Sequence, residues 1–242
     1  MIELRNVSYS YDNSFNALKD ITLNIEPGEA VAFVGVNGSG KSTLMKIING
    51  LVFPAGGTFS FDGIEITEKR LMDTSFAKAF HKRVGFVFQN SEAQLFCTTV
   101  YDEIAFGPRQ MGMAEEEVKS RVEDILRLLH IEELAKRQPY HLSGGEKKKI
   151  AIASVLVLNP EVIVLDEPMN GLDPKTKRFL RELMIALNKA GKTILCSTHD
   201  FDYVQGIFKR AVVFSKEHTV IRDGSYEEII TDREFLIENN II

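Results

Sequence analysis

The sequence predicts an α/β fold built on a parallel sheet, and three apolar runs carry this prediction. Residues 30–34, 162–165 and 193–196 are continuously apolar, which is typical of strands buried on both faces of a sheet. Apolar residues recur at helical spacing over residues 179–187, between the second and third runs. Strands that alternate with helices in this way pair in parallel.

The remaining elements of the N-terminal half follow from local patterns. Residues 2–8 and 21–25 alternate between apolar and polar side chains, which predicts strands with one covered face. A turn is expected at residues 27–28, where proline precedes glycine. A helix is predicted to begin at Lys41 and to stop at Gly50, directly after a glycine-rich loop.

Residues 90–160 have a different character and are predicted to be mainly helical. Within them, one apolar stripe indicates an amphipathic helix, formed by Val118, Val122, Ile125, Leu126 and Leu129. We expect a single domain over residues 1–242, with these residues as a helical lobe inserted in the core and residues 216–242 as a short tail. In and just before that tail, short strands are predicted at 212–214 and 220–221, and a helical turn at 227–230.

Composition excludes several classes of protein. A chain of 242 residues with 44% hydrophobic and 26% charged residues is typical of a globular domain. The net charge of −5 argues against nucleic acid as a partner, although residues 147–149 could form a local basic strip. Cys97 and Cys196 are interpreted as buried packing residues in a reducing compartment. No apolar run approaches the roughly 18 residues of a membrane span, so we expect a cytoplasmic protein.

The strongest chemical signal lies at residues 35–42, which fit the pattern G-x-x-x-x-G-K-[ST] between a strand and a helix. Glycines allow backbone N–H groups to surround phosphate oxygens, and the helix N-terminus adds positive potential. Lys41 would reach the outer phosphates, and the Ser42 hydroxyl would bind magnesium. The alternative, a glycine-rich turn with no ligand, does not explain the flanking strand and helix.

Two further polar groups follow predicted strands. Asp166 and Glu167 end the second apolar run, where one carboxylate can reach a magnesium ion and the other an attacking water. Taken alone, the pair could equally be two solvated charges. His199 follows the third run, where strand ends converge on a ligand, although a lone histidine there is more often structural.

A further segment, with two adjacent glycines, lies at residues 142–146, Leu-Ser-Gly-Gly-Glu. Ser143 and Glu146 fit a capping box at the start of a helix. Each glycine in a first turn costs about 1 kcal/mol of helix stability relative to alanine, so capping does not explain Gly144 and Gly145. Bare amides that approach a phosphate would explain them.

Together these residues resemble the motif set of the ABC ATPase family, in the family's order and over nearly the whole chain. The resemblance implies a mixed, mainly parallel core sheet, an N-terminal antiparallel β subdomain and a helical lobe. It identifies residues 142–146, on that lobe, as the family's signature segment. It also implies a D-loop at residues 171–173 and an adenine-stacking role for Tyr11. The implied reaction is hydrolysis of ATP with Mg²⁺.

The resemblance assigns a role to each motif residue. Glu167, His199 and Gln89 are the implied catalytic residues, and Ser42, Gln89 and Asp166 are the implied magnesium ligands. The implied nucleotide contacts are Tyr11, Gly35, Val36, Asn37, Gly38, Ser39, Gly40, Lys41, Ser42, Thr43, Ser143, Gly144, Gly145 and Glu146. By the same resemblance two copies face each other, so that the signature segment of one closes over ATP held by the other.

Within this family, residues 88–90, 94–96 and 104–108 resemble the A components of energy-coupling-factor (ECF) importers. The short C-terminus is similar to that of the cobalt and nickel importers rather than of the vitamin importers. This implies a homodimer, or a heterodimer with a paralogous ATPase, on the cytoplasmic face of the membrane. The implied partners are a membrane-embedded T component and a substrate-binding membrane component, with no nucleic acid.

Departures from the family pattern occur at Glu146, where glutamine is usual, and at Ser91 and Asn170. None removes a group that the chemistry needs. The alternatives are an ECF vitamin importer, an ABC importer of another kind, a soluble ABC ATPase and a P-loop kinase. A kinase would not need the signature segment. Phe96 is a candidate contact for the membrane partner, and the competing interpretation places it in the core.

Overall fold

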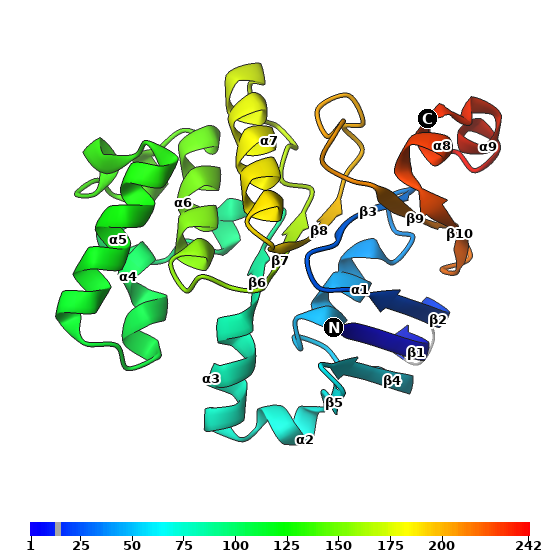
Figure 1. Cartoon of the computed structure of the whole chain (residues 1–242), viewed down its shortest axis with the longest axis horizontal. Helices are drawn as coiled ribbons and strands as arrows, with labels where there is room; N and C mark the ends of the chain where they lie inside the picture. Colours follow the sequence, from blue (N-terminus) through cyan, green and yellow to red (C-terminus); the bar gives the residue numbers. More distant parts are fainter. Residues whose placement is uncertain (13–15) are drawn as a thin grey trace.

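The computed structural model describes residues 1–12 and 16–242, and its centre is a twisted sheet (Figure 1). The strands of this sheet, in spatial order, are β10 (Val220–Ser225), β9 (Arg210–Phe214), β3 (Ala30–Gly35), β8 (Thr193–Ser197), β7 (Val162–Asp166) and β6 (Val84–Val87). All neighbouring strands from β9 to β6 pair in parallel, and β10 pairs antiparallel to β9. The expectation of a mixed, mainly parallel core sheet is confirmed.

The three apolar runs form strands in which every residue is buried, namely β3, β7 and β8. Helices and the second sheet cover both faces, so continuous apolar sequence is required there. The parallel pairing aligns the carboxyl ends of these strands. In the register, Asp166 at the end of β7 lies opposite Ser197 at the end of β8.

A second, antiparallel sheet lies beside the first (Figure 1), as the family resemblance implied. Its strands, in spatial order, are β2 (Asn16–Ile25), β1 (Ile2–Ser10), β4 (Gly56–Phe61) and β5 (Ile64–Glu65). Ile2 pairs with Ile25 on one side and with Phe61 on the other. The alternation of residues 2–8 and 21–25 predicted β1 and part of β2. The sequence patterns did not identify β4, β5 or β6.

The helices pack mostly against the faces of the sheets or gather beyond the β6 edge of the central sheet. They are α1 (Lys41–Ile48), α2 (Glu68–Leu71), α3 (Thr74–Arg83), α4 (Val100–Gln110), α5 (Glu115–Leu129), α6 (Gly144–Leu156), α7 (Pro174–Lys189), α8 (Tyr226–Thr231) and α9 (Arg233–Glu238). Short 3₁₀ turns are η1 (Ser91–Ala93), η2 (Glu132–Leu134) and η3 (Pro139–His141). None of the helices in the described part of the chain is long and apolar enough to cross a membrane.

Helix α1 packs between the two sheets and fixes the loop that precedes it. It contacts β2, β3 and β7, and Leu44, Met45 and Ile47 on it are fully buried. They belong to a core cluster that joins the antiparallel sheet to one face of the central sheet. Because this helix is held from both sides, the residues at its N-terminus are held with it.

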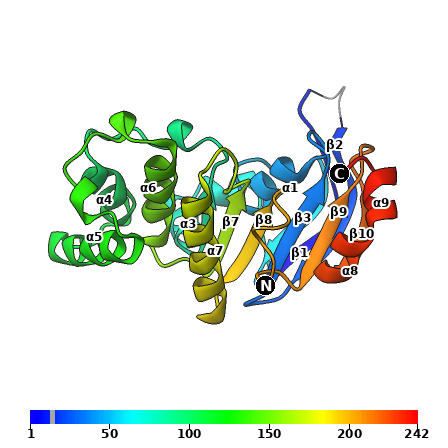
Figure 2. The same ribbon diagram turned by 90° about the horizontal axis from the view of Figure 1, so that it is seen from above.

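Helices α4, α5 and α6 gather beyond the β6 end of the central sheet, and α7 covers the sheet next to them (Figure 2). The stripe predicted on α5 is confirmed at Val118, Val122, Leu126 and Leu129, which are buried, whereas Ile125 is only partly buried. This packing places α6, with the signature segment at its N-terminus, against the segment that follows β6. The single-domain organisation, with lobe boundaries near residues 90 and 160, stays a prediction.

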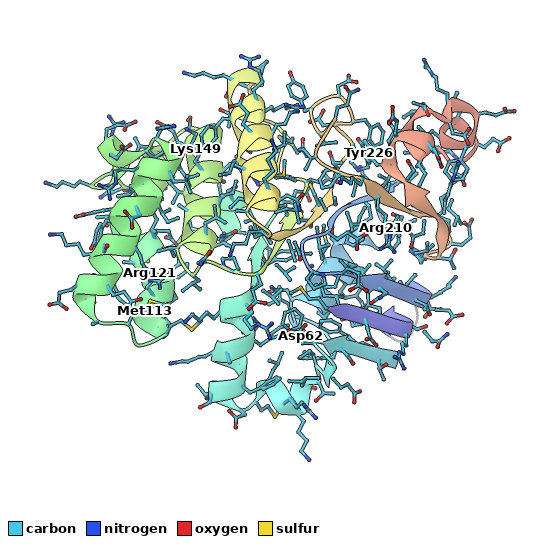
Figure 3. The ribbon with its side chains drawn as sticks, in the orientation of Figure 1. Asp62, Met113, Arg121, Lys149, Arg210 and Tyr226 are labelled. Atoms are coloured by element: carbon cyan, nitrogen blue, oxygen red, sulfur yellow. The ribbon has the colours of Figure 1, made fainter. Side chains whose placement is uncertain are left out.

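The structure rules out one possibility that composition left open, a basic strip, and shows that one expectation, the burial of Cys97, is wrong. Residues 147–149 form no basic strip: Lys148 is buried, Lys147 pairs with Glu92, and Lys149 (labelled in Figure 3) lies over the Phe179 ring. Successive helical residues point about 100° apart, so three adjacent lysines reach three different environments. Cys97 is only partly buried, because it lies in the loop before α4, whereas Cys196 in β8 is fully buried.

Candidate nucleotide site

The phosphate loop, residues 35–42, connects β3 to α1 and has a conformation that only glycine tolerates at some positions. Gly40 precedes α1 with a φ of 105°. A Cβ on Gly40 would lie 2.3 Å from the Ala17 carbonyl oxygen, closer than any van der Waals contact. The chain therefore requires glycine there for its own folding.

Lys41 is buried at the first turn of α1, with its ammonium held inside the loop. Its Nζ donates to the carbonyl oxygens of Gly35 at 2.7 Å and Val36 at 3.0 Å. Burial lowers the pKa of Lys41, and the carboxylates of Glu167 and Asp166 oppose this shift. An ammonium at the first turn of a helix, next to the backbone N–H groups of the loop, is suited to bind a phosphate anion.

A cavity of about 380 Å³ opens over the phosphate loop. Its lining consists of Tyr11, Ala17, Asn37, Gly38, Gly40, Lys41, Ser42, Thr43, Gln89 and Glu167. Half of Tyr11 is exposed, and its hydroxyl lies 3.0 Å from Thr43 Oγ1. Nine of the predicted nucleotide or catalytic positions, all of this lining except Ala17, thus border one space. The roles assigned to them stay predictions.

Asp166 and Glu167 are fixed by a serine that the motif analysis assigned no role. Ser197 Oγ donates to Asp166 Oδ1 at 2.6 Å and accepts from the Glu167 amide at 2.8 Å. Ser197 lies opposite Asp166 in the parallel register, so strand pairing was the signal that could have identified it. Asp166 itself is buried and lies outside the lining of the cavity.

The Glu167 side chain is held from two sides by predicted catalytic residues. Gln89 Nε2 donates to Glu167 Oε2 at 3.0 Å, and His199 Nε2 lies 3.0 Å from Glu167 Oε1. The same histidine nitrogen lies 3.0 Å from Asn37 Oδ1 of the phosphate loop. Segments distant in sequence therefore meet at one carboxylate.

Glu167 also has an unusual backbone conformation. Its φ is 43°, in the left-handed region that non-glycine residues rarely adopt. Such strain persists only where surrounding contacts fix the residue, and it is frequent at active sites. Here the contact is the Ser197 hydroxyl on the Glu167 amide. The carboxylate is consequently turned toward the cavity rather than into the sheet.

The signature segment lies at a different cavity, of about 520 Å³, whose lining includes Ser143, Gly145 and Glu146. The predicted capping box is present: Glu146 Oε2 accepts from the Ser143 amide at 2.8 Å and from its hydroxyl at 2.7 Å. These hydrogen bonds hold the pKa of Glu146 below its usual range. Within one chain, neither cavity is lined by both Lys41 and the signature segment.

The residues present fit ATP and magnesium. Ser39 Oγ in the phosphate loop is buried and has no hydrogen-bond partner within residues 1–12 and 16–242. The same part of the chain has no group of three or more histidine, cysteine or acidic residues that could enclose a metal ion. Magnesium needs few protein ligands when phosphates and water supply the rest, so Ser42, Gln89 and Asp166 are sufficient candidates.

Residues 18–170 match the sequence pattern of the ABC transporter family. A Clostridium acetobutylicum protein described as an ABC transporter ATP-binding protein is 62% identical over the full length of both chains. The nickel import ATP-binding protein LarO of Lactiplantibacillus plantarum is 44% identical over 92% of each chain. The ECF transporter ATP-binding protein EcfA of Methanosphaera stadtmanae is 41% identical, over all of this chain and 85% of its own.

Solved structures agree with the sequence relatives. The structure of cbiO1 from Clostridium perfringens, part of the ABC transporter complex cbiONQ, superposes with a TM-score of 0.83 and 36% identity. The match covers 99% of this chain and 94% of that one. The dimeric post-hydrolysis structure of the ATP-binding cassette MJ0796 with ADP and phosphate has the same TM-score, with 32% identity over 93% and 98% of the two chains. This chain therefore belongs to the ABC transporter family, and it is an ATP-binding and ATP-hydrolysing subunit.

Proposed function

We propose that this chain is the ATPase of an ECF-type importer and that its ATP turnover drives uptake of cobalt or nickel across the cytoplasmic membrane. The observation that carries the proposal is the nearly full-length similarity to a nickel import protein and to an ECF ATP-binding protein. The similarity to cbiO1 in both fold and sequence supports the same assignment. The subunit would be peripheral, at the cytoplasmic face.

The phosphate loop and Lys41 would bind the ATP phosphates through backbone amides and one ammonium. Ser42, Gln89 and Asp166 would hold magnesium, which when bound neutralises charge on the phosphate oxygens. The Ser197 hydroxyl fixes the orientation of the Asp166 carboxylate. Tyr11, at the open side of the cavity, would stack on the adenine.

Glu167 would accept a hydrogen bond from the attacking water and orient it toward the γ-phosphorus. Its carboxylate is well prepared for this because Gln89 and His199 each contact a different oxygen. His199 would also contact the γ-phosphate, since its Nε2 already lies beside Asn37 of the phosphate loop. Positioning of these groups before reaction supplies most of the rate enhancement.

Two copies would close head to tail, so that the signature segment of each covers the phosphate loop of the other. Two observations support this. Ser143 and Gly145 line a cavity separate from the phosphate loop of their own chain. A Cβ on Gly144 would meet nothing within 4 Å, so its own chain gives no reason for glycine. An isologous arrangement then produces two equivalent sites.

A membrane-embedded T component and a substrate-binding membrane component would complete the importer. Phe96 and Phe106 are the candidate contacts, with 67% and 40% of each side chain exposed. The interpretation of Phe96 as core is therefore wrong. Their rings pack edge to face, 4.9 Å apart, and buried Glu103 accepts from the Phe96 amide at 2.8 Å. A fixed, exposed aromatic pair suits a groove for a partner helix.

Docking is tested by Phe96→Asp in cells that carry the full transporter. An exposed side chain can change without loss of fold, so the variant should retain ATP turnover in isolation but should not co-purify with the membrane component. Lys119→Met, at an exposed position of α5, is the control. Retention of the membrane component by Phe96→Asp would place the docking surface elsewhere.

The cargo is tested by uptake in the same cells. Radiolabelled nickel or cobalt should accumulate with the wild-type chain and should not accumulate with Glu167→Gln, because hydrolysis drives the cycle. Glu167-dependent uptake of a vitamin would refute the metal assignment while leaving the ATPase assignment intact. Uptake of neither would contradict the ECF assignment as a whole.

A further inference from the structure

We propose that Lys148 is a positioning residue for ATP hydrolysis, which ties helix α6 to the backbone of Gln89 and so sets where the Gln89 side chain meets Glu167. The inference rests on the proposed catalytic role of Gln89. Lys148 is on the signature helix, and no motif assigns it a function. Its position in the interior between α6 and the end of β6 is what distinguishes it from its two lysine neighbours.

Lys148 is buried, with 3% of the residue exposed. Its Nζ donates to the carbonyl oxygen of Phe88 at 3.1 Å and to that of Gln89 at 2.8 Å. One ammonium thus holds two successive peptide groups at the point where the chain leaves β6. Gln89 in turn donates from its side chain to Glu167 at 3.0 Å. A continuous path of hydrogen bonds therefore runs from α6 through Gln89 to the catalytic carboxylate.

Gln94 forms a second hydrogen-bonded connection between helix α6 and the segment that follows β6. Its Oε1 accepts from the Phe88 amide at 3.1 Å, and its Nε2 donates to the Ala151 carbonyl at 2.9 Å and to Ser154 Oγ at 3.1 Å. Ala151 and Ser154 belong to α6. Both the amide and the carbonyl of Phe88 are therefore bonded to side chains that connect it to one helix.

A role in packing alone does not account for a lysine at this site. Removing an ammonium from water is unfavourable unless a counterion or several acceptors compensate. Within the part of the chain that the structure describes, no carboxylate forms an ion pair with Lys148; two carbonyl oxygens and the more distant charge of Asp166 stabilise it. A methionine would fill a similar volume without that cost, and would lose the bonds to Gln89.

The hydrogen bonds of Lys148 also connect the signature segment to Gln89 within one chain. Lys148 is three residues beyond Gly145, so it is on the same helical face, less than one turn from the signature segment. Any displacement of the N-terminus of α6 would move the Phe88 and Gln89 carbonyls with it. The signature segment would then influence Gln89, and through it Glu167, in its own chain.

The test is a double-mutant cycle in ATP turnover of the purified full chain. Lys148→Met alone should lower kcat about tenfold, in the range known for residues that orient a metal ligand, and change KM for ATP less than threefold. In a Gln89→Ala background the same change should lower kcat less than twofold further, because its effect passes through Gln89. Lys148→Gln, whose side-chain NH2 can still donate hydrogen bonds, should recover part of the loss. Lys119→Met is the control and should match wild type.

The outcomes separate this inference from the proposed function. If Gln89→Ala turns over like wild type, the catalytic role of Gln89 is wrong. If Gln89→Ala is slow and Lys148→Met lowers kcat by the same factor in both backgrounds, Lys148 acts independently and the inference is overturned. Should Lys148→Met not fold, Gln94→Leu cuts the second connection without removing a buried charge. Gln94→Leu should lower kcat only in the chain that keeps Gln89. An equal loss of kcat in the Gln89→Ala background would overturn the inference.

Discussion

The phosphate loop and the signature segment both carry glycines, but the chain needs them for different reasons. Gly40 has a φ of 105° and no room for a Cβ, so the fold of the single chain demands it. Gly144 has no left-handed φ, and a Cβ there would meet nothing within 4 Å. A glycine at residue 144 therefore indicates that a group outside the chain approaches closely. In our proposal this group is the ATP held by a facing copy.

Lys41→Ala should have the largest combined effect, because loss of the buried cation from the phosphate loop impairs both ATP binding and hydrolysis. We expect ATP turnover to fall by about a hundredfold or more. ATP binding should weaken as well, measured by equilibrium titration with a fluorescent ATP analogue. Lys46→Ala, on the same helix and outside the cavity lining, is the matched control. Turnover at the wild-type rate in Lys41→Ala would refute the phosphate-loop assignment.

Glu167→Gln separates binding from chemistry in the same cavity. The amide keeps the size of the carboxylate but orients an attacking water poorly, so hydrolysis should fall by a factor of about 10² to 10⁴ while Mg-ATP still binds. The variant should then accumulate as a dimer when ATP is saturating, measured by size-exclusion chromatography with light scattering. A monomer at saturating ATP would count against closure of two copies.

Most residues of the phosphate loop and the signature segment could be predicted from the sequence, because local sequence patterns encode them. The phosphate loop, Asp166 and Glu167 follow buried strands, so their place at one sheet edge follows from parallel pairing. Ser197 and Lys148 were missed because their roles depend on register and on how α6 packs, which no local pattern encodes. β5 and β6 were missed because they have only two and four residues, and β4 because its alternation is confined to residues 58–61, after two glycines.

Gly144→Asp tests the signature side of the comparison. An acidic residue in the first turn of a helix is favourable, so the chain should fold with unchanged or higher stability. ATP binding to the separate chain should also be unchanged, but turnover should fall at least about tenfold because the carboxylate repels phosphate across the dimer. Gly224→Asp is the control, since a Cβ there also meets nothing. Turnover equal to that control would contradict the proposal.

Tyr11→Ala should have the smallest effect. Stacking of an aromatic ring on a base contributes about 1 kcal/mol or more, which corresponds to an increase of about fivefold in KM for ATP. The maximal rate should change little, because the ring takes no part in the chemistry. Steady-state kinetics over a range of ATP concentrations measures both. An unchanged KM would place the adenine contact elsewhere in the cavity.

The most direct test of a shared site is to mix two inactive chains. Lys41→Ala has a defective phosphate loop and an intact signature segment, and Gly144→Asp has the reverse. In a mixed dimer one site would combine the two intact halves, so ATP turnover should return, to about a quarter of the wild-type level in an equal mixture. If the mixture hydrolyses no more ATP than the two chains do separately, the signature segment does not act across the dimer and the account is contradicted.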